Sequence, residues 1–249
     1  MSEPIAGDER AFGSPSGRRQ PRRLPSRYAE PWRDAFDCRV RPALVPGVRI
    51  LDVGSGRRPT IPVEQRPAGV CYEGLDLSGA ELGKAPPGSY DELHVADVVQ
   101  RLPELEGRFD LIVSWQVLEH VKPLVVAFEN LRTYLRPGGL LVAQMSGKFS
   151  AFGLVNAVVP QRVGNFAMKR LLNRDPETVF PAHYDDCTYR SLGQILGSWS
   201  EVDILPRYNG SSYFRFLAPA HALYMFYENW AYRGQHRNLA THYLVTAVK

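Results

Sequence analysis

The sequence has few cysteines, no long apolar run and no internal repeat. Three cysteines, Cys38, Cys71 and Cys187, are scattered over 249 residues, and no two of them have the spacing of metal ligands. This excludes a disulfide framework and favours a reducing, cytoplasmic setting. The first residues lack the apolar core of a signal peptide, and no stretch approaches the roughly 18 uninterrupted apolar residues of a membrane-spanning helix. The sequence therefore predicts neither a disulfide-rich secreted domain nor a membrane-spanning protein.

The net charge of +4 comes mostly from the N-terminal segment. Residues 1–27 hold six arginines against three acidic residues, and the stretch SPSGRRQPRRLPSR is rich in proline, serine and glycine. Such a composition buries too little apolar surface to offset the entropy of ordering. We therefore predict a disordered basic tail over residues 1–26 and a single domain over residues 27–249. Because the rest of the chain is near neutral, its charge does not indicate a nucleic-acid groove.

Short β-rich runs alternate with helical patterns along this domain. The runs are VRILDVG, VCYEGLDLS, DELHVAD, RFDLIVSW, GGLLVAQM, WSEVDILPRY and THYLVTAV. This alternation predicts an α/β fold with a doubly wound, seven-stranded, mostly parallel sheet. Pro137, Gly138 and Gly139 are expected to end the helix before the fifth run. Residues 146–187 break the alternation after that run, and we expect them to form a lid over the acceptor.

The first strand leads into a loop of unusual composition. In RILDVGSGRRP, Asp52 stands inside a strand, and Gly54, Ser55 and Gly56 follow it directly. Glycine permits a tight turn and a close approach of the backbone to a ligand, and ligands of such sheets bind beyond the carboxyl ends of the strands. Asp76 ends the second strand twenty residues after Gly56, a spacing that suits the hydroxyls of a ribose.

Two classes of cofactor fit these residues, and a loop without any ligand is a third reading. A dinucleotide fingerprint expects a third glycine or alanine where this chain has Pro59, and the carboxylate of Asp52 would repel a pyrophosphate. An adenosyl sulfonium that also carries an ammonium would instead be attracted by Asp52.

At this point the sequence resembles the seven-stranded, class I S-adenosylmethionine-dependent methyltransferases, from about Tyr28 to the C-terminus. The stretches that carry the resemblance are LDVGSG, LDLS, HVADVVQRLP, FDLIVSWQVLEHV and LRPGGLLV. The overall pattern is similar to the type 11 enzymes of this family. Arg57 and Arg58 stand where many members have a third glycine, and they would either hold the methionyl carboxylate or remain a solvated pair.

The resemblance implies S-adenosyl-L-methionine as the cofactor and assigns roles around it. The loop from Gly54 to Gly56 would wrap the cofactor, Asp52 would serve the methionyl ammonium, and Asp76 would bind the ribose. Asp97 and Val98 would contact the adenine amine. The other positions expected to contact the cofactor are Ser55, Leu77, Ser114 and Trp115, and packing alone is an alternative role for the tryptophan.

The acceptor side carries weaker signals. The stretch SWQV after the fourth strand lacks the Asn/Asp-Pro-Pro-aromatic signature of DNA amino-methylating enzymes, so we expect no DNA. The aromatic and apolar content of residues 146–187 and 213–232 favours a small-molecule acceptor, and RNA or protein acceptors, attracted by the basic tail, are the alternatives. A base matters only for an acceptor that must lose a proton. The expected bases are His183, oriented by Asp185 or Asp186, and then His120, for which packing is the other reading. The residues expected to border the acceptor are Tyr28, Trp32, Gln116 and Tyr184.

The sequence thus predicts an enzyme that O-methylates a small molecule in secondary-metabolite, polysaccharide or quinone-like metabolism. The alternatives are N- or C-methylation, a nicotinamide-dependent oxidoreductase, and a non-catalytic protein that binds S-adenosylmethionine. The stretch NFAMKRLLNR has apolar and basic faces, which fit a solvated amphipathic helix or, less often, a weak contact with a membrane surface. We expect no metal site, and the oligomeric state stays open.

Overall fold

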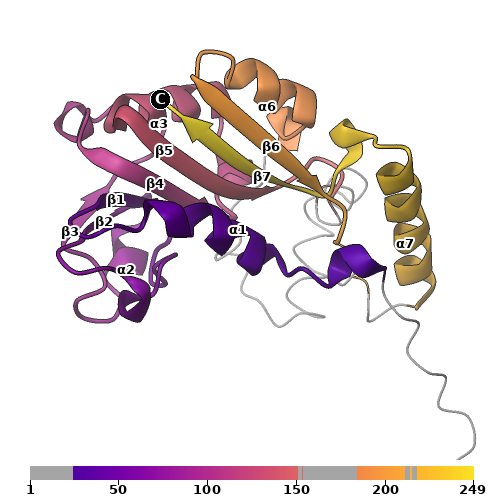
Figure 1. Ribbon diagram of the computed structural model, residues 1–249, viewed down its shortest axis with the longest axis horizontal. Helices are drawn as coiled ribbons and strands as arrows, with labels where there is room; N and C mark the ends of the chain where they lie inside the picture. Colours follow the sequence, from indigo (N-terminus) through magenta and orange to yellow (C-terminus); the bar gives the residue numbers. More distant parts are fainter. Residues whose placement is uncertain (1–24, 151–152, 154–183, 211–213, 215–217) are drawn as a thin grey trace, which may run out of the picture.

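The computed structural model describes residues 25–150, 153, 184–210, 214 and 218–249. They build a seven-stranded sheet with the order β3-β2-β1-β4-β5-β7-β6 (Figure 1). The strands are β1 (Arg49–Val53), β2 (Cys71–Asp76), β3 (Glu92–Val95), β4 (Phe109–Trp115), β5 (Leu135–Ser146), β6 (Glu201–Arg207) and β7 (His242–Val248). The first five strands pair in parallel, and β7 runs antiparallel to both of its neighbours. The predicted α/β fold is confirmed, because each predicted run overlaps one strand.

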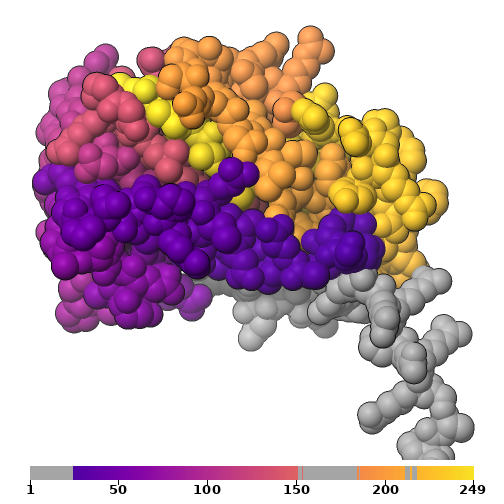
Figure 2. Space-filling model, in the orientation of Figure 1, coloured from indigo at the N-terminus to yellow at the C-terminus, as the bar shows by residue number. Residues whose placement is uncertain are grey.

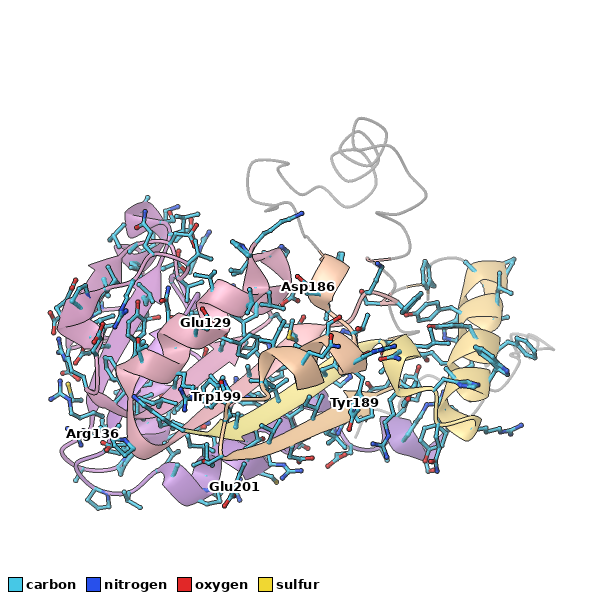
Figure 3. All side chains as sticks on the ribbon, turned by 90° about the horizontal axis from the view of Figure 1, so that it is seen from above. Glu129, Arg136, Asp186, Tyr189, Trp199 and Glu201 are labelled. Carbon is cyan, nitrogen blue, oxygen red and sulfur yellow. The ribbon has the colours of Figure 1, made fainter. Side chains whose placement is uncertain are left out.

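Helices cover both faces of the sheet, as Figure 1 shows. The helices are α1 (Trp32–Val40), α2 (Gly79–Leu82), α3 (Leu124–Tyr134), α6 (Tyr189–Ile195) and α7 (Ala218–Arg233). Helix α1 covers one face together with α2, and α3 and α6 cover the other. Figure 3 looks onto the second face and labels Glu129 on α3 and Trp199 after α6. Helix α7 stands at the end of the molecule beside β6 and β7 (Figure 1).

Alternating side chains of the strands supply a separate core on each face. In β1, Leu51 and Val53 belong to the core beneath α3 and α6, and Ile50 belongs to the core beneath α1. Asp52 shares the face of Ile50, because successive side chains of a strand point to opposite faces. The sheet is therefore buried on both sides, as a parallel sheet requires.

The helix before β5 ends earlier than the sequence predicts. Helix α3 ends at Tyr134, and Leu135 is already extended with φ −70° and ψ 147°. Pro137, Gly138 and Gly139 lie inside β5 rather than at the helix end. The proline thus ends the helix, as expected, but the last helical residue lies three positions before it, because the residue that precedes a proline, Arg136, already favours extended backbone.

An N-terminal arm, residues 25–31, crosses to the far end of the sheet. Arg27 donates to the carbonyl of Tyr208 at 2.5 Å and to Asn229 Oδ1 at 2.8 Å, and the hydroxyl of Tyr28 donates to the buried Glu228 of α7. Figure 2 shows this arm in indigo meeting the yellow surface of α7. Residues 1–24, nearly all of the predicted tail, lie outside the described residues.

The two ends of the expected lid meet at one edge of the sheet. Lys148 lies two residues after the end of β5, and its N–H donates to the carbonyl of Cys187 at 2.9 Å. The 3₁₀ turn η7 (Tyr184–Asp186) precedes that cysteine. Most of the expected lid lies outside the described residues, so the lid stays a prediction. Among the helices that the structure describes, none is both long and apolar enough to cross a bilayer.

Candidate active site

The loop after β1 turns sharply at the edge where the parallel strands end, called the carboxyl edge here. Gly54 has φ +76° and Gly56 has φ +54°, a left-handed region that residues with a Cβ rarely adopt. A Cβ on Gly54 would lie 2.3 Å from Cγ1 of Val117, so only glycine allows this loop to pack against the chain that follows β4. The loop and residue 117 are thereby held side by side.

Asp52 is fully buried beneath this loop and organises it. Its Oδ2 accepts from the N–H of Thr60 at 2.6 Å and from the hydroxyl of Tyr72 at 2.6 Å, and its Oδ1 accepts from Thr60 Oγ1 at 2.7 Å. Burial raises the pKa of the carboxyl, and these hydrogen bonds oppose that rise. Both oxygens thus hold the loop at Thr60, and Oδ2 also links it to β2 through Tyr72. The expected contact with a methionyl ammonium stays a prediction.

A tyrosine that the sequence analysis overlooked holds the same loop from the other side. The hydroxyl of Tyr90 hydrogen-bonds Ser55 Oγ and donates to the carbonyl of Gly56 at 3.0 Å. Burial raises the pKa of this phenol, so it is neutral and able to donate. Arg57 pairs with Glu81 at 2.8 Å on the surface, a partner that favours the solvated reading of the arginine pair.

Asp76 stands half-buried at the end of β2, beside the glycine loop. Its Oδ1 accepts from the N–H of Ser78 at 2.8 Å, and its Oδ2 lies 3.6 Å from where a Cβ on Gly56 would be. Burial raises the pKa of this carboxyl, while the N–H groups of Ser78 and Gly56 lower it. A carboxylate offers about four acceptor positions, so Asp76 keeps capacity for a ligand. The next residue, Leu77, is 59% exposed and offers apolar surface there.

The end of β3 lies next to Asp76 and carries the third expected acidic residue. The N–H of Ala96 donates to the carbonyl of Asp76 at 3.1 Å. Asp97 Oδ1 accepts from the N–H of Val99 at 3.1 Å, so its side chain caps a turn at the edge. Val98 is 6% exposed and its side chain lies in the core. Asp76 and Asp97 are thus brought together, as expected for neighbouring strand ends.

Ser114 and Trp115 close β4 with packing roles. Ser114 is fully buried, and its Oγ donates to the carbonyl of Val53 at 3.2 Å. Trp115 meets Phe36 of α1 edge to face at 5.0 Å between ring centroids, and the guanidinium of Arg33 lies 5.4 Å from its ring. These contacts agree with the packing alternative for Trp115, and its contact with the cofactor stays a prediction.

The chain after β4 forms a buried polar cluster with the end of β5. Gln116 has φ +59°, unusual for a residue with a side chain, and its Oε1 accepts from Ser146 Oγ at 2.9 Å. Glu119 lies in the 3₁₀ turn η5 (Leu118–His120), and its Oε1 accepts from the N–H of Ser146 at 3.2 Å. Burial raises the pKa of Glu119 to about 7, against lowering by hydrogen bonds from its own N–H and from Ser146. We call Gln116, Glu119 and Ser146 the β4–β5 cluster.

Two of the expected acceptor residues lie farther along the edge. Trp32 donates from Nε1 to Asn209 Oδ1, and its ring centroid lies 3.8 Å from that of His242. His242 begins β7 and pairs in register with Ser146, so Trp32 and the β4–β5 cluster adjoin the same strand pair. Tyr28 instead contacts Glu228 of α7. Burial lowers the pKa of His242 to about 3, which keeps this imidazole neutral.

The remaining expected residues divide between described and undescribed parts of the chain. His120 ends η5, half-buried, and its N–H donates to the carbonyl of Val117 at 2.9 Å. Tyr184 packs against the core beneath α3 and α6. His183 lies outside the described residues, and so its predicted role as a base stays a prediction.

One group of potential metal ligands is already compensated by cations. Glu73, Glu92 and His94 approach one another on β2 and β3. However, Glu73 Oε1 lies 2.8 Å from both Arg49 and Arg108. Two guanidiniums therefore take the place that a metal ion would need, and the group is an ion-pair network.

The comparison with protein families decides between the cofactor readings. The family described as "Methyltransferase domain" matches residues 18–196, more than half of the chain. The chain belongs to the class I S-adenosylmethionine-dependent methyltransferases. A ubiquinone biosynthesis O-methyltransferase of a Chelativorans species is 30% identical over 114 residues, which are 43% of this chain and 44% of the relative. The chain thus matches less than half the length of that curated relative.

Solved structures of methyltransferases share the fold. An S-adenosylmethionine-dependent methyltransferase from Mesorhizobium loti has a TM-score of 0.51 at 17% identity, covering 84% of this chain and 95% of that one. Phosphoethanolamine N-methyltransferase 2 of Haemonchus contortus, solved with S-adenosyl-L-methionine, has a TM-score of 0.53 at 15% identity, covering 88% of this chain and 52% of that one. At these identities the likeness concerns the fold alone.

The site of this methyltransferase fits the family's cofactor in its chemistry. Adenosine needs an acceptor for its ribose hydroxyls and apolar surface for its ring, and Asp76 and the exposed Leu77 offer both at the end of β2. A pyrophosphate would need donors and positive charge, whereas this edge presents Asp76 and Asp97. Sequence reasoning missed Glu119 and Ser146. Glu119 lies in the stretch FDLIVSWQVLEHV, directly before His120, which the sequence favours as a base because histidine titrates near neutral pH.

Proposed function

We propose that this chain transfers the methyl group of S-adenosyl-L-methionine to a hydroxyl of a small-molecule acceptor. One observation supports the proposal: the half-buried carboxylate of Asp76 and the buried β4–β5 cluster adjoin the same glycine loop, which packs against Val117. Oxygen as the methylated atom is supported by the relatives that are named O-methyltransferases. Secondary-metabolite, polysaccharide and quinone-like compounds are the proposed classes of acceptor.

The cofactor half of the site is assigned as follows. When bound, the cofactor supplies an electrophilic methyl carbon on a positively charged sulfur. Asp76 accepts hydrogen bonds from the ribose hydroxyls, and Leu77 packs beside the nucleoside. Asp97 and Val98 border the adenine, while the loop from Gly54 to Gly56 wraps the methionyl part. Asp52 contributes charge beneath that loop and fixes its shape through Thr60 and Tyr72.

The acceptor half of the site lies over the ends of β4, β5 and β7. Gln116 and Trp32 border the acceptor here, because both adjoin the strand pair of Ser146 and His242. Tyr184, at the returning end of the expected lid, also borders it. Tyr28 acts at a distance, since it fixes the N-terminal arm on α7. Holding the acceptor in line with the sulfur and excluding water lowers the activation free energy of transfer by roughly 7 to 11 kcal/mol.

A binding measurement and a transfer assay test the proposal. Calorimetry with S-adenosylhomocysteine is expected to show binding, and NAD is expected to show none under the same conditions. The methyl group of tritiated S-adenosylmethionine is then offered to phenols, primary amines, duplex DNA and RNA. Label in the phenol fraction supports O-methylation. Label only in the amines, DNA or RNA would replace the proposed acceptor class, and binding without any transfer would favour the non-catalytic reading.

A further inference from the structure

Glu119 has one oxygen whose role is clear. Strand β4 ends at Trp115, but β5 continues to Ser146, so the last N–H of β5 on that side has no strand partner. Oε1 of Glu119 accepts from this N–H at 3.2 Å. The interaction caps the strand end, and it explains why a hydrogen-bond acceptor is buried at this position.

The second oxygen of Glu119 has no such explanation. The side chain is 2% exposed, and within the described part of the chain its Oε2 has no hydrogen-bond partner. Nε2 of Gln116 is also buried and has no hydrogen-bond partner within the described part of the chain. Both side chains accept a hydrogen bond from Ser146. A buried polar group left unsatisfied costs about 1 to 3 kcal/mol. Such groups call for an explanation, and here two of them belong to side chains that share Ser146 as a hydrogen-bond partner.

This cluster lies next to the point of the sheet where ligands of such folds bind. Strand order reverses between β1 and β4, and ligands of such sheets bind beyond the carboxyl ends of the strands at this reversal. Val117, one residue after Gln116 and two before Glu119, contacts the glycine loop at Gly54. The residue that packs against the glycine loop therefore lies between two members of the β4–β5 cluster in the sequence, which brings the cluster close to that loop.

We propose that Glu119 is the proton acceptor of methyl transfer, with Oε2 receiving the hydrogen of the acceptor's hydroxyl while Oε1 keeps the end of β5 in place. This inference rests on the proposed function, since it presumes a hydroxyl acceptor. It assigns the role of base to Glu119 rather than to His120 or His183. Gln116 Nε2 donates to the acceptor beside the same oxygen and helps to orient it.

The proton and electrons balance in one displacement. The hydroxyl oxygen forms a bond to the methyl carbon as the bond from that carbon to sulfur breaks. The electron pair of the broken bond stays on sulfur. The hydroxyl proton moves to Oε2 of Glu119. The resulting carboxylic acid releases the proton to solvent when the methyl ether leaves. No oxidant, reductant or further reactant is required.

The protonation behaviour of Glu119 suits this task. Its pKa of about 7 follows mainly from burial, and a general base is most effective when its pKa lies near the working pH. His242, with a pKa lowered to about 3, is a much weaker base. The titratable residues nearest in these elements are His120 in the same turn, Lys122 after it, Lys148 after β5, and His242 and Tyr243 at the start of β7. Above pH 7 the carboxylate prevails, so the transfer rate rises with pH and then levels off.

Infrared titration tests the contact without turnover. A protein saturated with S-adenosylhomocysteine should show a carboxylic-acid band that disappears with a midpoint near pH 7. Phenol, whose hydroxyl donates to the carboxylate, should lower that midpoint by stabilising the charged form. Anisole, which lacks the hydroxyl, should leave it unchanged. Glu119→Gln should remove the band, and Glu129→Gln, the same change at an exposed position of α3 (Figure 3), should keep it.

The transfer assay provides the second readout. Glu119→Gln keeps an oxygen for the strand-end cap but takes up no proton, so methyl transfer to phenol should fall by about 100-fold to 10,000-fold and lose its rise near pH 7. Equal transfer by this variant and the wild type would overturn the inference, and so would a midpoint that phenol does not move. If the wild type binds S-adenosylhomocysteine but methylates no phenol, the proposed function fails. The shift that phenol causes in the midpoint of the carboxylic-acid band then tests by itself whether Glu119 contacts a hydroxyl. That midpoint is measured on the wild type, so it stands even if the variant does not fold.

Discussion

The two halves of the carboxyl edge differ in how their polar groups are satisfied. At the ends of β1 and β2, both oxygens of Asp52 accept hydrogen bonds from Thr60 or Tyr72. The hydroxyl of Tyr90 donates a hydrogen bond to the glycine loop. Behind β4 and β5, Glu119 Oε2 and Gln116 Nε2 are buried without partners among the described residues. The polar groups of the first half are satisfied within the fold, whereas the second half leaves two polar atoms without partners among the described residues.

This difference separates binding from chemistry. A cofactor with a fixed shape is served by a loop that is rigid before the cofactor arrives, because preorganisation reduces the cost of binding. The acceptor must approach the methyl carbon closely, and desolvated polar atoms there interact more strongly with it than in water. We therefore expect changes in the first half to affect cofactor affinity or stability, and changes in the second to affect the rate and its pH dependence.

The largest effect is expected for Asp76→Ala. Two charge-assisted hydrogen bonds to the ribose together contribute on the order of 3 to 6 kcal/mol before desolvation, so calorimetry should show a loss of S-adenosylhomocysteine affinity of at least about 100-fold. Asp203→Ala, at an exposed position of β6, is the matched control and should bind normally. Unchanged affinity of Asp76→Ala would mean that the end of β2 does not hold the ribose.

Glu119→Gln should change how stability depends on pH. The folded-state pKa of about 7 lies above the unfolded value of about 4.3, so the folded state binds more protons between these values. The free energy of unfolding of the wild type therefore falls as pH rises through this window, by on the order of 3 kcal/mol. The free energy of unfolding of the variant should not show this decrease, because glutamine does not ionise. Urea unfolding at pH 5 and pH 8 measures it, with Glu129→Gln as control, and parallel behaviour of wild type and variant would place the ionisation elsewhere.

A smaller effect is expected for Asp52→Asn. The amide nitrogen cannot accept from Thr60 or Tyr72, so at least one buried donor loses its partner, which costs about 1 to 3 kcal/mol of unfolding free energy. Urea denaturation measures this cost. Calorimetry on the folded variant tests the charge separately: normal stability with lost S-adenosylhomocysteine affinity would mean that Asp52 serves the methionyl ammonium directly.

Removal of residues 1–24 should have the smallest effect. The described contacts with α7 begin at Arg27, so this truncation should leave the melting temperature and S-adenosylhomocysteine affinity unchanged. Tyr28→Phe removes the hydroxyl that donates to buried Glu228, and it should lower the melting temperature by several degrees. A truncated chain that melts as low as Tyr28→Phe would show that the tail docks.

The sequence predicted the scaffold better than the acceptor half, for a physical reason. Local patterns in the sequence predict the strands and the acidic residues at their ends. Both Asp76 and Asp97 could therefore be predicted at this edge of the sheet. Glu119 meets Ser146 at a separation of 27 residues, and Trp32 meets His242 across nearly the whole chain. No local pattern reveals such pairs. The buried bonds of Asp52 were missed as well, because a strand sequence does not say which partners its neighbour supplies.

The structure of the complex with S-adenosylhomocysteine is the most direct test of this division of the edge. The account predicts both ribose hydroxyls within hydrogen-bond distance of the Asp76 carboxylate, the adenine beside Asp97, and the sulfur facing the β4–β5 cluster of Gln116, Glu119 and Ser146. A ribose held away from Asp76, or a sulfur that faces away from Glu119, would contradict it.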